Sequence, residues 1–178
     1  MRDALRQRVA TAEGSAGDKQ KFLARIRRGN LTRAENRFSH FCVYFAAFDP
    51  VKKQVFIGHH KKSDLWLFNG GHIEPNELPE DAVVREANEE WGLSIAKNNL
   101  PPIALITLTV IEHPEKQICR KHYDLWYFLP YDASAFHPDG HALGNEFFTY
   151  GWKSYEEAER LLTSLPTKDA LHYLKNSR

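Results

Sequence analysis

Cysteine is scarce in this chain, which holds only Cys42 and Cys119 among its 178 residues. Two cysteines are too few for a disulfide framework, and they lie too far apart in sequence for a C-x-x-C redox or zinc motif. We therefore expect two free thiols in a reducing compartment. Long apolar runs are also missing, so no segment is expected to span a membrane. The first residues, MRDALRQRVATAEGS, lack the apolar core of a secretory signal. These absences predict a cytoplasmic protein without a membrane partner.

A surplus of charge of either sign is absent too, because 24 Lys and Arg residues balance 23 Asp and Glu residues to a net charge of +1. Bulk electrostatics therefore gives no reason to expect a nucleic-acid or membrane-surface partner. A small anionic substrate needs only a local positive patch or a metal. Hydrophobic residues make up 42% of the chain and charged residues 26%, which is typical of a globular protein with one main domain.

The residue pattern predicts a helical N-terminal appendage (residues 1–36) before a larger domain (residues 37–178). Two short helices are predicted in the appendage, at 3–12 and 17–28, and we expect them to pack on the domain or on a partner subunit. In the larger domain, strands alternate irregularly with helices, which favours an α/β fold with a mixed sheet packed between helices. Strands are predicted at 39–48, 54–59, 65–68, 103–112, 123–129 and 147–152, and helices at 79–91, 154–162 and 168–175.

The predicted helix 79–91 carries the most informative pattern. Glu86, Glu89 and Glu90 stand at i, i+3 and i+4, so they project from one face. Like charges at this spacing destabilise a helix by roughly 0.2–0.5 kcal/mol per pair. A bound divalent cation would offset that repulsion, because hard cations take several oxygen ligands. A solvated acidic face is the plainer interpretation.

The surroundings of this helix favour the cation hypothesis. Val84, Ala87 and Trp91 form an apolar stripe that we expect to bury against the sheet, leaving the glutamates on a different flank. Before the helix, Gly70-Gly71 predicts a tight turn whose backbone approaches a metal or phosphate closely, with a free carbonyl as an oxygen ligand. An ordinary loop between strand and helix is the alternative for the two glycines.

Residues 71–93 resemble the Nudix box, G-x5-E-x7-R-E-U-x-E-E-x-G-U, where U is a bulky aliphatic residue. All seven fixed letters match, at Gly71, Glu77, Arg85, Glu86, Glu89, Glu90 and Gly92. Leu93 fits the last U, and Ala87, smaller than usual at the first U, is the one departure. At a background of ~7% per letter, seven chance matches occur at ~10⁻⁸ per starting position, so the motif is highly specific. The strand pattern extends the resemblance to about residues 38–165, and the GGH at 70–72 is similar to a small sub-branch of the family.

The resemblance implies a Nudix-type α/β/α sandwich with a mixed central sheet. It also implies metal-dependent hydrolysis of a diphosphate linkage in a nucleoside-diphosphate-linked substrate, with Mg²⁺ as the cofactor and Mn²⁺ as a substitute. By the same resemblance, Glu89 and Glu90 would be the principal metal ligands. The Gly71 carbonyl would add a ligand, and Glu86 would either ligate a metal or act as the general base.

The resemblance also implies roles for residues around the metal. Arg85 and Glu77 would hold the box loop against the helix, which is a structural role. Many relatives recruit a further carboxylate from a later loop, and Glu146 is our choice because it precedes the aromatic strand 147–152. A solvated loop glutamate is the alternative. Two other residues compete for the role, Glu112 and Glu115.

Histidine and lysine residues near the box are candidate substrate contacts. His72 lies inside the box loop and Lys61 lies upstream, although a loop-ordering and a plain surface role are the alternatives. The residues His113, Cys119 and His122 do not fall at zinc-finger spacing, so we expect no structural zinc.

Two other functions compete with hydrolysis. An isopentenyl-diphosphate isomerase-like enzyme would share the fold but rely on a catalytic cysteine and a looser box, and neither Cys42 nor Cys119 has that context. A non-catalytic nucleotide-sensing domain would commonly lack box glutamates, whereas this chain keeps them all. Many relatives form homodimers, and the N-terminal helices would suit such a contact. The exact substrate and the number of metals stay open.

Overall fold

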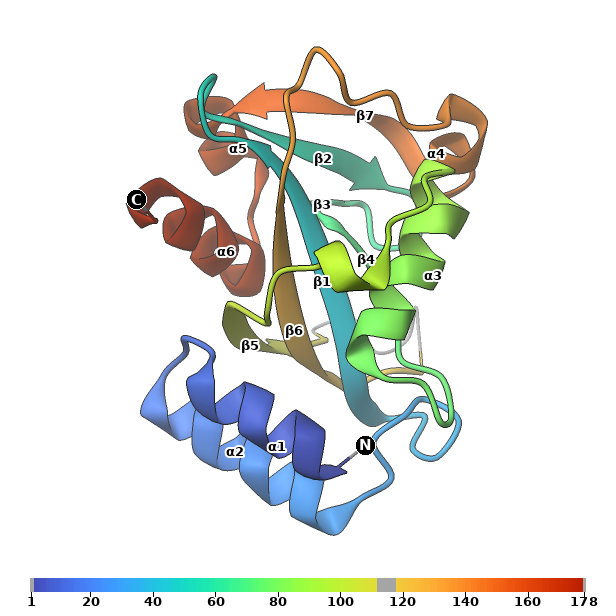
Figure 1. Cartoon of the computed structure of the whole chain (residues 1–178), viewed down its shortest axis with the longest axis vertical. Helices are drawn as coiled ribbons and strands as arrows, with labels where there is room; N and C mark the ends of the chain where they lie inside the picture. Colours follow the sequence, from blue (N-terminus) through green and yellow to red (C-terminus); the bar gives the residue numbers. More distant parts are fainter. Residues whose placement is uncertain (1, 112–117, 178) are drawn as a thin grey trace.

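A mixed sheet forms the centre of the protein and carries helices on both faces (Figure 1). The computed structural model describes residues 2–111 and 118–177. The strands are β1 (Ser39–Asp49), β2 (Gln54–His60), β3 (Leu65–Leu67), β4 (Asn69–His72), β5 (Leu105–Val110), β6 (Lys121–Pro130) and β7 (Phe147–Ser154). The helices are α1 (Arg2–Thr11), α2 (Ala16–Arg28), α3 (Pro79–Trp91), η1 (Lys97–Asn99), α4 (Gly140–Glu146), α5 (Tyr155–Leu161) and α6 (Leu165–Asn176).

Strand β1 organises the sheet, because it pairs with three neighbours. The main path runs β3-β2-β1-β6-β5, while β4 also pairs with β1 and β7 pairs with β2. The β1–β6 pairing is parallel and the other pairings are antiparallel. The prediction of an α/β fold with a mixed central sheet between helices is confirmed.

Alternate residues of β1 face two separate apolar layers, as the two-residue period of a strand requires. Phe41, Val43 and Phe45 lie in one buried cluster with residues of α1, α2 and α3. Ala46 lies in the other cluster with residues of α5 and α6, and the partly buried Tyr44 packs against it. A side chain's position along β1 therefore decides which face of the sheet it occupies.

The N-terminal helices contribute directly to the core of the protein. Leu5, Val9, Phe22 and Ile26 are at most 3% exposed and belong to the same apolar cluster as Phe41 of β1. The backbone between the two helices pairs with the sheet, since Glu13 forms a parallel bridge with Leu105. Within the described residues, no helix is long and apolar enough to cross a bilayer.

The structure corrects two local predictions around the box. Gly70 and Gly71 do not form a tight turn, because residues 69–72 continue as the extended strand β4 against β1. The buried stripe of α3 contains Val83, rather than Val84, with Ala87 and Trp91, and Glu90 also lies on that buried side. Three short elements, β4, α4 and η1, were absent from the predicted pattern.

Candidate active site

Helix α3 begins and ends where its sequence dictates. Pro79 occupies the first turn, where a missing N–H costs nothing, and Gly92 ends the helix in the left-handed conformation at φ 65°. These boundaries give the box glutamates three different environments. The side chain of Glu89 is 58% exposed and that of Glu86 is 12% exposed, whereas Glu90 is buried.

The Glu90 carboxylate is held below the surface between α3 and β4. The Asn69 side-chain amide donates a hydrogen bond to it, and the nearby Gly70 backbone N–H also favours its charged form. Burial nevertheless raises the pKa of Glu90 to about 8, and repulsion from the carboxylates of Glu86 and Glu146 adds to this effect. The mutual repulsion shows that α3 and the end of α4 bring three carboxylates toward one place. A cation among them would relieve that repulsion.

Glu86 packs directly on the glycine that opens the box. A Cβ atom at Gly71 would lie 1.9 Å from Oε1 of Glu86, so a side chain there would displace the Glu86 carboxylate. The glycine is therefore required for close packing of a carboxylate on β4 rather than for a turn. Burial raises the pKa of Glu86, while the neighbouring Arg85 guanidinium opposes the rise.

Arg85 joins the box loop to the helix through several charge-assisted hydrogen bonds. Its guanidinium donates to Glu77 at 2.9 and 3.0 Å, to Glu86 at 2.8 Å and to the His72 carbonyl at 2.9 Å. Glu77 also accepts from the Glu74 backbone N–H at 2.9 Å. Arg85 and Glu77 thus link the box loop to α3, and Arg85 also contacts the exposed Glu89 at 3.3 Å.

Glu146 ends α4 beside basic groups from β2 and the turn that follows it. Its carboxylate lies 3.4 Å from His60 Nε2 and 3.4 Å from Lys62 Nζ. Its backbone carbonyl accepts from the Lys61 N–H at 2.9 Å. The residue stands at the edge of the carboxylate group rather than alone in solvent. The competing residues Glu112 and Glu115 lie outside the described residues.

A cavity of about 540 Å³ opens next to Glu86. Arg33 and Arg37 reach it from the connection between α2 and β1, and Arg85 reaches it from α3. Ile73 and Ile118 supply apolar walls. The combination of three guanidinium groups and apolar walls is suited to a ligand that carries both phosphates and a hydrophobic ring.

Comparison with known proteins identifies the family. The sequence profile described as NUDIX domain matches residues 38–174. The chain belongs to the NUDIX family. An RNA pyrophosphohydrolase of Pseudomonas putida is 50% identical over 40 residues, which cover 22% of this chain and 25% of that protein. The chain thus matches only a quarter of the length of this curated relative.

Solved structures agree on the NUDIX fold. The E. coli dihydroneopterin triphosphate pyrophosphohydrolase superimposes with a TM-score of 0.62 at 17% identity, covering 77% of this chain and 96% of that one. A NUDIX hydrolase structure from Listeria monocytogenes gives a TM-score of 0.55 at 24% identity, covering 76% and 94%. At these identities the likeness establishes the fold.

The two residues predicted to contact the substrate, His72 and Lys61, differ in their position relative to the cavity. His72 lines the cavity beside Glu86. Lys61 donates its Nζ hydrogen bond to the Gly144 carbonyl of α4 and does not line the cavity. The structure therefore brings His72, but not Lys61, to the described cavity.

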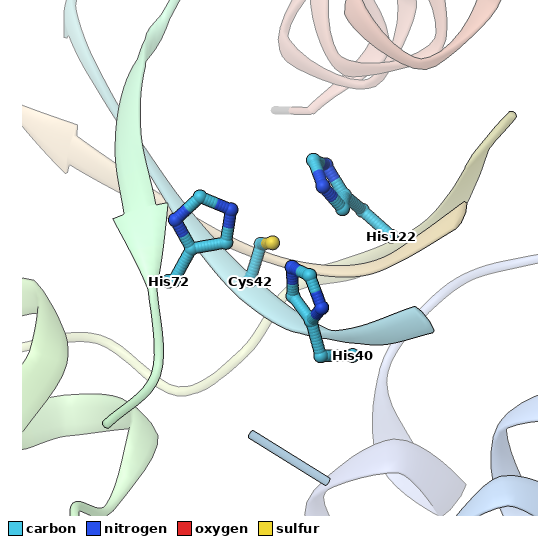
Figure 2. Close-up of side chains that lie close together, drawn as sticks. All are labelled: His40, Cys42, His72 and His122. Atoms are coloured by element: carbon cyan, nitrogen blue, oxygen red, sulfur yellow. The ribbon is translucent and has the colours of Figure 1, made fainter. Parts of the chain in front are cut away.

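Sequence reasoning missed a second group of side chains, beside the NUDIX box, that could hold a metal ion. One donor atom from each of His40, Cys42, His72 and His122 lies within 4.8 Å of the others, and Figure 2 shows the four side chains converging. The expectation of no structural zinc was based on His113, Cys119 and His122, and His113 lies outside the described residues. Sequence spacing did not point to this group, because its four members come from three strands. The only local signal is the i, i+2 pair His40 and Cys42 within one strand.

Proposed function

We propose that this chain hydrolyses a phosphoanhydride bond in a nucleoside-diphosphate-linked small molecule, using Mg²⁺ held by the box. The observation that carries the proposal is the buried Glu90 carboxylate, flanked by Glu86 and Glu146 and facing β4. Carboxylates and a backbone carbonyl are the oxygen donors that Mg²⁺ prefers, so the residues present fit the ion. Mn²⁺, which accepts the same donors, is proposed as a substitute.

The ligand set follows from the different exposures of the box glutamates. We assign Glu90 and the Gly71 carbonyl as ligands in the inner part of the site, with Glu86 beside them as the general base. Glu89 is assigned to the rim, where its exposed carboxylate is free to turn from Arg85 toward a bound ion. Glu146 is assigned as the later carboxylate, because it is close enough to Glu90 to raise the pKa of that residue.

The chain's own groups account for proton transfer and substrate orientation. Mg²⁺, when bound, supplies charge neutralisation at the diphosphate oxygens. Burial raises the pKa of Glu86, so its carboxylate is a better acceptor for the proton of an attacking water than an exposed glutamate. Arg33 and Arg37 are placed to bind the substrate phosphates in the cavity. Both arginines precede the residues matched by the family profile, so the profile does not include this contact.

A substrate panel tests the proposal. The panel contains nucleoside diphosphate sugars, dinucleoside polyphosphates, nucleoside triphosphates, isopentenyl diphosphate and an RNA with a 5′-triphosphate. We expect Mg²⁺- or Mn²⁺-dependent cleavage of at least one small nucleotide and loss of cleavage in EDTA. Glu90→Gln should reduce kcat more than Glu89→Gln, and the exposed Glu156→Gln is the matched control.

Each other result contradicts a stated part of the proposal. Conversion of isopentenyl diphosphate to its isomer supports the isomerase alternative. Nucleotide binding without cleavage supports a sensor. Cleavage confined to the RNA overturns the small-molecule assignment, and this arm is included because the Pseudomonas putida relative is named for RNA. Cleavage that persists in EDTA and in Glu90→Gln overturns the metal site.

A further inference from the structure

Four side chains from three strands meet on the face of the sheet opposite the box helix. His40 and Cys42 are two residues apart on β1, so their side chains project to the same side of the sheet. His122 of β6 is the direct pairing partner of His40, and His72 of β4 is the direct partner of Cys42. Pairing partners share a face, so all four side chains project together, as Figure 2 shows.

The donor atoms are close enough to share one ion. All four lie within 4.8 Å of one another, and the imidazole centroids are 4.8, 5.0 and 5.4 Å apart. Ligand distances of about 2.0–2.3 Å around a tetrahedral ion place donors roughly 3.3–3.8 Å apart. Small side-chain rotations are therefore sufficient to bring the four donor atoms within coordinating distance of one ion.

Two further observations concern the ring nitrogens that face the cluster, of which those of His40 and His72 also contact Cys119 Sγ. His122 Nε2 is buried and has no hydrogen-bond partner among the described residues. His40 places Nδ1 2.9 Å from the Asn36 carbonyl, which orients the ring and leaves Nε2 directed at the cluster. A histidine that ligates a metal through one nitrogen commonly donates from the other to such a carbonyl. An unpaired buried nitrogen costs free energy unless a ligand satisfies it.

We propose that His40, Cys42, His72 and His122 bind one transition-metal ion of the Zn²⁺ class. Three imidazole nitrogens and one thiolate suit Zn²⁺ or Co²⁺ and do not suit Mg²⁺, which prefers oxygen. The proposed site adjoins the box without using its carboxylates. Consecutive residues of a strand point to opposite faces, so Gly71 faces Glu86 while the neighbouring His72, which also lines the cavity, faces the cluster. A metal here would join β4, which carries Gly71, to β1 and β6.

The surroundings are compatible with this chemistry. The cations Arg33, Arg25 and Lys62 are close enough to disfavour a bound cation, whereas the buried carboxyl of Asp124 faces Cys42 from β6. A second thiol, Cys119, lies 3.7 Å from His40 Nε2 and 3.9 Å from His72 Nε2. Cys119 thus adjoins the proposed site as an additional sulfur donor.

Cobalt substitution in the full-length protein tests the proposal. Chelator-treated protein is titrated with Co²⁺ in excess Mg²⁺, so that oxygen sites are occupied by Mg²⁺. We expect one Co²⁺ per chain, with intense visible bands of tetrahedral Co²⁺ and a near-ultraviolet thiolate charge-transfer band, all removed by Zn²⁺. X-ray absorption of the Zn²⁺ form should report nitrogen and sulfur ligands. Absence of both the bands and sulfur ligation overturns the proposal.

Variants locate the ion and separate this site from the box. Cys42→Ser should lose the charge-transfer band, and His122→Asn should weaken Co²⁺ binding at least about tenfold. The exposed His172→Asn is the matched control and should bind normally. Glu90→Gln should keep the cobalt spectrum while losing hydrolysis, so failure of one site is distinguishable from failure of the other. Unchanged spectra and unchanged Co²⁺ affinity in both Cys42→Ser and His122→Asn would refute the assignment. Loss of the charge-transfer band in Cys119→Ser alone would show that Cys119, and not Cys42, provides the thiolate ligand.

Discussion

Glu90 is a buried carboxyl group, and its protonated and charged forms contribute differently to the free energy of unfolding. In the metal-free protein its pKa rises from 4.5 to about 8, so the folded state holds a proton that the unfolded state releases. Stability contributed by the protonated form is present below pH 4.5 and is lost as pH rises toward 8. The loss is on the order of a few kcal/mol. A site that is poorly stable when empty is consistent with one built to receive a cation.

Glu90→Gln should therefore stabilise the metal-free protein at alkaline pH while abolishing catalysis. In EDTA, the free energy of unfolding of the wild type should fall between about pH 5 and pH 8. That of the variant should fall less, because only the raised pKa values of Asp124 and Glu86 still contribute to the loss. Urea unfolding at several pH values, paired with kcat in Mg²⁺, measures both effects. A variant that is less stable than the wild type at pH 8 in EDTA would contradict the argument.

Gly71→Ala should disable the site through one added methyl group. The new Cβ would lie 1.9 Å from the Glu86 carboxylate and displace it. We expect kcat to fall at least about tenfold, as when a group that orients a metal site is lost. Gly144→Ala is the control, because a Cβ there has no atom within 4 Å. Equal activity of the two variants would show that Glu86 does not need this position.

At the scale of elements, the box is a helix and a loop joined by one guanidinium. Residues 73–78 have no regular structure of their own and are positioned by Arg85 and Glu77. The planar guanidinium contacts Glu77, Glu86 and the His72 carbonyl together, which an ammonium group cannot do.

Arg85→Lys should loosen this connection although it preserves the charge. We expect a loss of about 1–3 kcal/mol in the free energy of unfolding, because buried acceptors lose their donors. We also expect a fall in kcat, because Glu86 loses its orienting partner. Thermal unfolding and steady-state kinetics measure these changes, with Arg160→Lys on α5 as the control. A variant with wild-type Tm and kcat would show that charge alone is required.

At the scale of the whole molecule, the N-terminal helices are part of the hydrophobic core. Phe22 of α2 is fully buried and packs edge-on against Phe41 and Tyr123, with centroids 5.5 and 5.1 Å away. Phe22→Ala should lower the free energy of unfolding by about 3–5 kcal/mol and leave kcat unchanged at low temperature. Phe148→Ala, at a ring that is 63% exposed, is the control. If Phe22→Ala lowers the free energy of unfolding by no more than the control does, the N-terminal helices pack only weakly on the sheet.

This packing also bears on assembly. The apolar residues of α1 and α2 are committed to the chain's own core, so a homodimer formed through these helices would use their polar faces. Dimerisation through the N-terminal helices stays a prediction.

The sequence alone determined the features that depend on local spacing. Pro79, Gly92 and the i, i+3, i+4 glutamates predict helix 79–91 and the box because helical geometry relates residues a few positions apart. The capping box at Ser154 and Glu157 similarly predicts the start of α5. The NUDIX family and the mixed sheet follow from such signals together.

Tertiary structure alone decided which distant residues meet. The glycine pair was predicted as a turn, yet pairing with β1 makes it a strand on which Glu86 packs. The burial of Glu90, its approach to Glu146 and the meeting of His40, Cys42, His72 and His122 also depend on strand register and on packing between α3 and α4. Sequence periodicity shows which side of an element a residue occupies, but long-range pairing decides what lies opposite it.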